Sequence, residues 1–424
     1  MNVTQETSNY ISKSRKFHDS WALILYAISF LGFSTYAIVK EKSFSLDLSF
    51  AEPVIKNTLF CSIVVLVAIT LNFVGFRFVP VFFLKATVCT FPLVLIATLF
   101  FFEFHAISLF YSLFAIFLWA VFVYRNWVYF GVMAKTMCVG VKIMLSNFFT
   151  TLLGNIMCLS LIILQIFLMT QLRTKLSLHH SKMQENLFTF FYILNLFWTL
   201  SNAIYFFKVY ITSVVSYNLV EFGEHSKMSP VIKNTMYALG SICFAGLMVA
   251  VVSTLRFFVD QEKDRRSNNR DRNNLNGFFK NFLTVLLSAL EDIIEFINAL
   301  TLPYIAVHGE GYIESVKKSY DISLRQNSFA ATGIAALNVS LFITQVSVTS
   351  ICLGFSIALA KSYFNDMIIF KSIIYSACIP LICFSTIMMI FSSAFLGIIY
   401  IKTENEDLII SKYKSELNAA FENK

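Results

Sequence analysis

In the stretch LEDIIEFINALTLPYIAVHGEGYIESVKKSYD, residues 290–321, three carboxylates (Glu291, Asp292 and Glu295) interrupt the otherwise apolar residues 290–307. Glu291, Glu295 and Asn298 recur at i, i+4 and i+7, so they share one face of a helix. Acids at membrane depth are costly, and they usually mark a binding or ion site. The glycines of residues 308–311, HGEG, then predict a break before an amphipathic helix.

The rest of the chain is strongly apolar. Of its 424 residues, 57% are hydrophobic and only 14% are charged, and the mean hydropathy is +0.70. Apolar runs of about 20 residues, the length of a membrane-spanning helix, recur from Trp21 to Ile401. The sequence therefore predicts an all-α fold, a polytopic transmembrane helical bundle of about ten spans.

The hydropathy pattern divides the chain into a polar N-terminal tail at residues 1–20, a transmembrane domain at residues 21–401 and a polar C-terminal tail at residues 402–424. The first apolar run is longer than a signal-peptide core and has no evident cleavage site, so we expect a retained span. Between the fourth and fifth spans, residues 125–147 predict an amphipathic helix at the membrane interface. The spans are expected near residues 21–39, 58–76, 80–102, 105–124, 148–172, 186–218, 234–258, 279–305, 329–360 and 367–401.

Charge and motifs exclude several classes of protein. The formal charge of +8 is spread over tails and loops, so the lipid bilayer is the expected partner and nucleic acid is not. The eight cysteines lie in apolar or amphipathic runs without a CxxC pair, which predicts buried thiols rather than metal ligands or disulfides. Without a Walker loop, GxSxG or HExxH motif, we expect no enzyme, cofactor or metal site. Nothing in the sequence indicates an oligomeric state.

A second polar group lies in the aromatic run at residues 197–217. Trp198, Ser201, Tyr205 and Lys208 follow i, i+3, i+7 and i+10, so they share a helical face. Two interpretations stay open for this run: a binding surface, or a helix packed against lipid with Lys208 snorkelling to the interface. The acids of residues 290–321 likewise lie either in a cavity or at the interface, where carboxylates cost little.

Several short motifs are shared with one family of membrane proteins. They are Phe296-Ile297-Asn298, residues 304–309 (YIAVHG), Ile313-Glu314 and, upstream, residues 240–244 (GSICF). These motifs resemble the choline-transporter-like family, within it the short fungal branch, and the resemblance covers about residues 100–405. Glu291 falls on the acid of the family's pattern.

The resemblance implies a plasma-membrane, multi-pass transporter of choline or a related quaternary amine. Such a cation donates no hydrogen bond from its methyl groups and is bound by ring faces and negative charge. The implied substrate-binding residues are Trp198, Tyr205, Glu291, Asn298 and Tyr304. The implied gating or coupling residues are Lys208, Glu295 and His308. Because Lys208 would repel a cation, we expect it to face away from the site or to pair with an acid.

Two rival interpretations remain at this point. Where the family carries an acid, an asparagine and a histidine after Trp198, this chain has Ser201, Tyr205 and Lys208, which favours a non-transporting scaffold or receptor-like protein. A membrane enzyme acting on lipid headgroups would need His308 and Glu310 to converge on a cavity.

Overall fold

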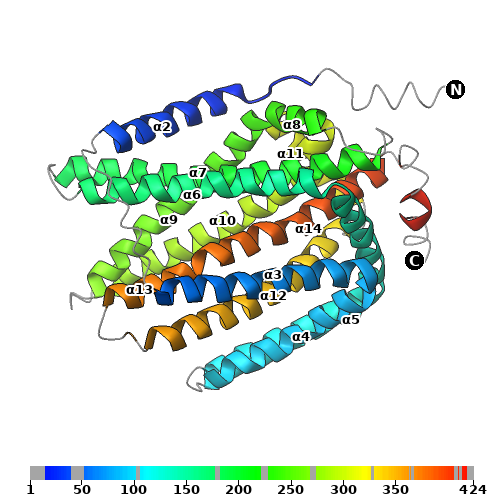
Figure 1. Cartoon of the computed structure of the whole chain (residues 1–424), viewed down its shortest axis with the longest axis horizontal. Coiled ribbons are helices and arrows are strands. Elements are labelled where there is room, and N and C mark those ends of the chain that lie inside the picture. The colour runs from blue at the N-terminus through cyan, green and yellow to red at the C-terminus, as the bar shows by residue number, and fades with distance from the viewer. Residues whose placement is uncertain are drawn as a thin grey trace. The chain divides into compact units, whose positions relative to one another are not determined.

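The computed structural model describes residues 15–39, 52–101, 106–176, 182–220, 228–267, 274–325, 329–361, 363, 367–404, 409 and 413–417. These residues are almost entirely helical (Figure 1), which confirms the predicted all-α bundle. The helices are α2 (Ser20–Val39), α3 (Glu52–Phe78), α4 (Pro80–Phe101), α5 (Ala106–Ser146), α6 (Phe148–Leu176), α7 (Lys182–Leu219), α8 (Met228–Tyr237), α9 (Leu239–Ser267), α10 (Asn274–His308), α11 (Tyr312–Arg325), α12 (Phe329–Lys361), α13 (Met367–Ser376) and α14 (Cys378–Glu404).

Within the described residues the predicted spans fall on these helices, but the span at residues 234–258 is divided between α8 and α9 and the span at residues 367–401 between α13 and α14. Within the described residues, seven helical stretches are long and apolar enough to cross a membrane: Glu52–Phe78, Tyr129–Ser146, Phe148–Leu168, Leu187–Leu219, Leu239–Gln261, Ala336–Lys361 and Ser372–Thr403. Ser20–Thr35 and Pro80–Thr90 are apolar but shorter. Helix α10 has 35 residues, enough to span, and carries the three acids.

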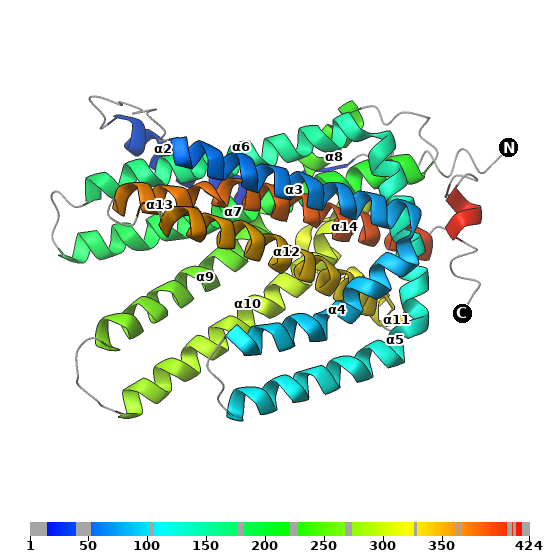
Figure 2. The ribbon, with the colours of Figure 1, turned by 60° about the horizontal axis from the view of Figure 1, so that its bottom comes forward.

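The segment predicted as a separate interfacial helix, residues 125–147, instead continues the preceding helix as the second half of α5. Figures 1 and 2 show α5 changing direction, so that its second half runs across neighbouring helices. It packs closely on α14, since a Cβ on Gly140 would lie 3.3 Å from the Cβ of Ala394. Its side chains are largely buried, so protein rather than lipid covers much of its surface.

The helices form two compact units. Unit 1 comprises Met1–Phe44, Phe149–Val214 and Ser226–Ile322, and unit 2 comprises Ser45–Phe148, Val215–His225 and Ser323–Lys424. In unit 2, a buried asparagine joins three helices. The Asn57 amide of α3 donates to the Ile373 carbonyl at 2.7 Å and to Ser376 Oγ at 2.8 Å on α13, and it accepts from Ser356 Oγ of α12 at 3.0 Å.

Unit 1 holds residues 290–321, which carry the three acids. Helices α9 and α10 run side by side in both views (Figures 1 and 2), and α2 packs on α9. Residues from α7, α9, α10 and α11 meet in one apolar cluster that includes Tyr205, Ile242, Ile305 and Tyr312. The predicted polar face of α10 borders this cluster, so the candidate site lies within a single unit.

Candidate functional site

The polar face of α10 begins with an ion pair to α9. Glu291 accepts a hydrogen bond from Ser253 Oγ at 2.5 Å and pairs with the Arg256 guanidinium. The Glu291 side chain is only 17% exposed, so this pairing offsets part of the cost of removing the carboxylate from water. The acid that matches the family's pattern is therefore already neutralised by a cation of the protein.

One turn later, Glu295 faces α7. Its carboxylate lies close enough to the Lys208 ammonium for the two charges to interact. The same ammonium lies over the ring of Tyr205, 5.4 Å from the ring centroid, within the range of a cation–π contact. Glu295 is thus the acid whose charge acts on Lys208, and the expectation that Lys208 faces away from the site or pairs with an acid stays a prediction.

Asn298 is the buried end of the polar face. Its amide nitrogen donates to the Tyr205 hydroxyl at 3.2 Å, and its amide oxygen accepts from the Tyr312 hydroxyl at 2.5 Å. Burial raises the pKa of Tyr312, in α11, to about 12, so this phenol stays a donor at neutral pH. The three residues join α7, α10 and α11 through side chains whose hydrogen-bonding groups are matched inside the bundle.

The structure places the other predicted ring donors apart from this group. Trp198 is buried, donates from its indole nitrogen to the Cys243 carbonyl at 2.9 Å and packs edge-on against Tyr26 at 5.3 Å. Seven residues separate Trp198 from Tyr205, about 10 Å along a helix. Tyr304 is also buried, and its ring stacks on His308 with 4.0 Å between centroids. Of the five predicted substrate-binding residues, Tyr205 and Asn298 are joined by a hydrogen bond.

His308 and Glu310, the pair that an embedded enzyme would need, are engaged separately. The His308 ring lies against Tyr304, whereas Glu310 accepts a hydrogen bond from Lys318 at 2.5 Å. This hydrogen bond raises the pKa of Lys318 in α11. Within the described part of the chain, no group of three or more His, Cys, Asp and Glu side chains is placed to hold a metal ion.

A feature that the sequence analysis missed lies beside this site. Residues 15–19, placed in the polar tail from the sequence, bind to unit 1, and we call them the N-terminal clamp. The Arg15 guanidinium donates to the carbonyls of Ala306 at 3.2 Å and Val307 at 2.9 Å, in the last turn of α10. Carbonyls there lack helical partners and carry partial negative charge, so a cation stabilises them.

The other end of the clamp binds the start of α11. Asp19 accepts hydrogen bonds from the Tyr312 backbone N–H at 2.9 Å and from Ser241 Oγ at 2.7 Å. Gly311, which precedes α11, has no side chain to cap the helix, and Asp19 supplies the missing acceptor. A Cβ on Gly240 would lie 2.0 Å from the His18 carbonyl oxygen, so the clamp requires glycine at that position. Through Tyr312, the clamp is connected to Asn298.

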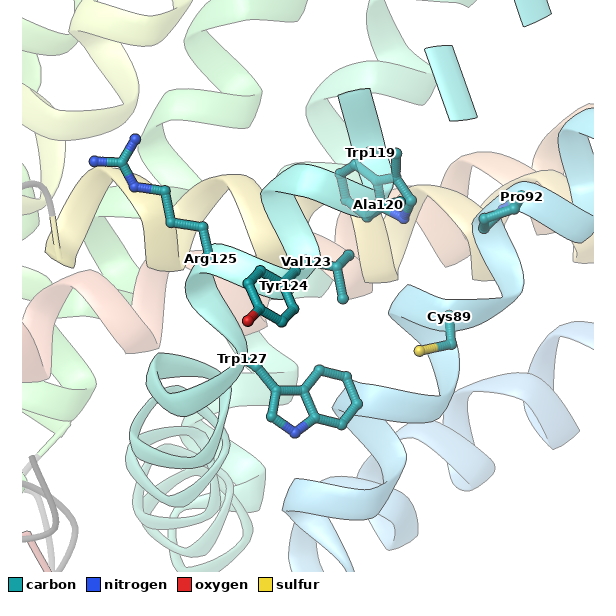
Figure 3. Close-up of a pocket in the computed structure, with 8 residues that line it drawn as sticks. All are labelled: Cys89, Pro92, Trp119, Ala120, Val123, Tyr124, Arg125 and Trp127. Carbon is teal, nitrogen blue, oxygen red and sulfur yellow. The ribbon is translucent and has the colours of Figure 1, made fainter. Parts of the chain in front are cut away.

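A ring-lined cavity occurs in unit 2 between α4 and α5 (Figure 3). Its volume is about 780 Å³, and Trp119, Tyr124 and Trp127 line it together with Cys89. No acid is among its described lining residues, and Lys85 places its ammonium 4.2 Å from the Trp127 ring centroid. Because Lys85 lies beside this cavity and no carboxylate is among its described lining residues, the cavity is poorly suited to a cationic substrate. The acids of unit 1 therefore form the better candidate site.

Comparison with known proteins agrees with the helices and motifs described above. The sequence profile of the family described as plasma-membrane choline transporters matches residues 108–404. Protein PNS1 of Debaryomyces hansenii is 25% identical over 142 residues, which cover 33% of this chain and 26% of that protein. The alignment with PNS1 thus reaches a limited part of either chain. The family profile, in contrast, extends over most of the sequence, and the chain belongs to the plasma-membrane choline transporter family.

Proposed function

We propose that this chain carries choline or a related quaternary amine across the plasma membrane, and that the cation binds in unit 1 beside Tyr205. Membership of the family and the apolar helices make the chain a multi-pass plasma-membrane protein. Transport, and choline as the substrate, are proposed from that membership and from the chemistry of the site.

The observation that carries the proposal is the polar face of α10. Glu295 is exposed and Lys208 is half-buried, and we propose that a ligand reaches both. Tyr205 and Asn298 are buried behind them. A trimethylammonium group needs a ring face and a nearby negative charge, and Tyr205 with Glu295 offers both. We assign Glu295, rather than the paired Glu291, as the counter-charge, and Asn298 as the residue that orients the Tyr205 ring.

This set of groups matches a transporter better than a tight receptor. One cation–π contact contributes on the order of 1 to 2 kcal/mol when desolvated, and a partly exposed carboxylate adds a similar amount. The sum, about 2 to 4 kcal/mol, corresponds to a Kd of about 1 to 30 mM, which allows release on the opposite side. Trp198 and Tyr304 lie on the same helices and remain the proposed second layer of rings.

Reconstitution tests the proposal. Purified protein in proteoliposomes should take up radiolabelled choline with saturable kinetics, and excess unlabelled choline should suppress the uptake. The assay is run with and without an imposed pH gradient, because a proton gradient is one way to drive uptake. The absence of saturable uptake under both conditions would overturn the proposed transport.

A non-transporting scaffold or receptor-like protein is the second candidate function. The observation that favours it is the packing of the site, because Trp198 and Tyr205 are buried and hydrogen-bonded within the protein. If choline binds to the purified protein and no uptake occurs in liposomes, the receptor-like function is supported.

A further inference from the structure

Lys208 is the residue of the site that choline transport does not explain. It lies on α7 three residues after Tyr205, and its ammonium lies over the Tyr205 ring. A lysine on a lipid-facing surface would extend to the interface. This lysine instead faces Glu295 of α10.

The surroundings of the ammonium are those that a substrate cation requires. A ring face lies 5.4 Å from the nitrogen, and the nearby acid supplies the opposite charge. The Tyr205 hydroxyl is held by Asn298, which fixes the ring in the orientation that presents this face. A cation that belongs to the protein thus lies over the ring face and interacts with the counter-charge, while Asn298 holds the ring.

We propose that Lys208 is a tethered competitor for the substrate: a quaternary ammonium can bind at Tyr205 and Glu295 only by displacing the Lys208 ammonium from them. The inference rests on the proposed function, because it concerns the same site. It assigns to Lys208 the role of a specificity-determining residue that lowers the affinity for cations, rather than a role in binding them.

The size of the effect follows from two contributions. A tethered group competes at an effective concentration in the millimolar range or above, which weakens any free ligand of similar intrinsic affinity. The ammonium of Lys208 and a quaternary ammonium at the same site would also repel each other as like charges. Because the ammonium can swing away, we expect removal of its charge to strengthen choline binding by about ten- to a hundredfold.

Three substitutions separate charge from bulk. Lys208→Met keeps a long apolar chain and removes the charge, Lys208→Ala also uncovers the Tyr205 ring, and Lys208→Arg keeps both charge and bulk. Lys317→Met is the matched control, because Lys317 is an exposed lysine of the same unit on α11. Size-exclusion chromatography establishes that each variant is folded before binding is measured.

The test is equilibrium binding of radiolabelled choline to the purified full-length protein in detergent, with tetramethylammonium as the competitor. The expected result is a Kd about ten- to a hundredfold lower for Lys208→Met and Lys208→Ala, and no gain for Lys208→Arg or Lys317→Met. In the Lys208→Met background, Glu295→Gln should reverse the gain. Unchanged or weaker binding in both uncharged variants, or no binding by any variant, would overturn the inference.

Failure of the tethered-competitor inference can be distinguished from failure of the proposed transport function. Saturable uptake by the wild type together with an unaltered Kd in Lys208→Met refutes the tethered competitor and leaves transport standing. Tighter binding in Lys208→Met without uptake by the wild type supports the competitor and refutes transport.

Discussion

Asp19 connects the N-terminal clamp to α9 and α11, and its replacement should loosen the first turn of α11. One carboxylate oxygen accepts from both the Tyr312 backbone N–H and Ser241 Oγ. Its backbone φ of 53° lies in the left-handed region, which aspartate and asparagine tolerate and alanine disfavours. Asp19→Ala therefore removes the acceptor of two hydrogen bonds and adds backbone strain.

The expected losses of free energy rank three substitutions of Asp19. Loss of a capping acceptor costs about 0.5 to 2 kcal/mol, and the left-handed conformation costs a residue with a Cβ about 1 to 2 kcal/mol more than glycine. With the lost Ser241 bond, we expect Asp19→Ala to destabilise the clamp by about 3 kcal/mol and Asp19→Gly by about 2 kcal/mol. Asp19→Asn keeps an acceptor and tolerates the backbone, so about 1 kcal/mol is expected.

Hydrogen exchange followed by mass spectrometry measures this loosening directly. Because 1.4 kcal/mol is a factor of ten, the first amides of α11 should exchange about a hundredfold faster in Asp19→Ala and about fivefold faster in Asp19→Asn. Peptides from unit 2 serve as the internal control. Wild-type exchange in Asp19→Ala, or faster exchange in Asp19→Gly than in Asp19→Ala, would refute the reasoning.

Three further experiments test the packing within each of the two units. Asn57→Ala removes three buried hydrogen bonds. At about 0.6 kcal/mol each in a membrane protein, it should lower the unfolding free energy by about 2 kcal/mol, measured by steric trapping. Gly154→Ala places a Cβ 2.4 Å from the fully buried Tyr210 ring, and the overpacking should cost about 1 to 3 kcal/mol in the same assay. In a double-mutant cycle with Arg256→Gln and Glu291→Gln, the coupling energy should be about 1 kcal/mol, because Arg256 is 41% exposed. Additive effects of the two substitutions would show that the two side chains do not interact.

The local features of the candidate site could be predicted from sequence because helical periodicity fixes which residues share a face. Spacing alone placed Glu291, Glu295 and Asn298 on one side of α10. Periodicity does not say which partner each residue meets. Glu291 is matched by Arg256 and Trp198 by the Cys243 carbonyl, contacts set by the packing of α7 and α9.

The N-terminal clamp could not be predicted because its contacts join residues far apart in the chain. Arg15 and Val307 are 292 positions apart, and Asp19 and Tyr312 are 293 apart. No local pattern in residues 1–20 distinguishes these charges from those of a solvated tail. The one usable signal was glycine at positions 309 and 311, which indicates a helix end and a helix start without a capping side chain of their own.

The assignment of Glu295 as the counter-charge for the substrate is tested most directly by choline uptake in proteoliposomes containing Glu295→Gln, compared with the wild type and with Asp292→Asn. Asp292 is an exposed acid on the same helix and serves as the matched control. The account predicts that Glu295→Gln raises the KM for choline at least about tenfold, while Asp292→Asn stays near the wild type. An unchanged KM in Glu295→Gln, with saturable uptake by the wild type, would place the cation elsewhere in the molecule and contradict the account.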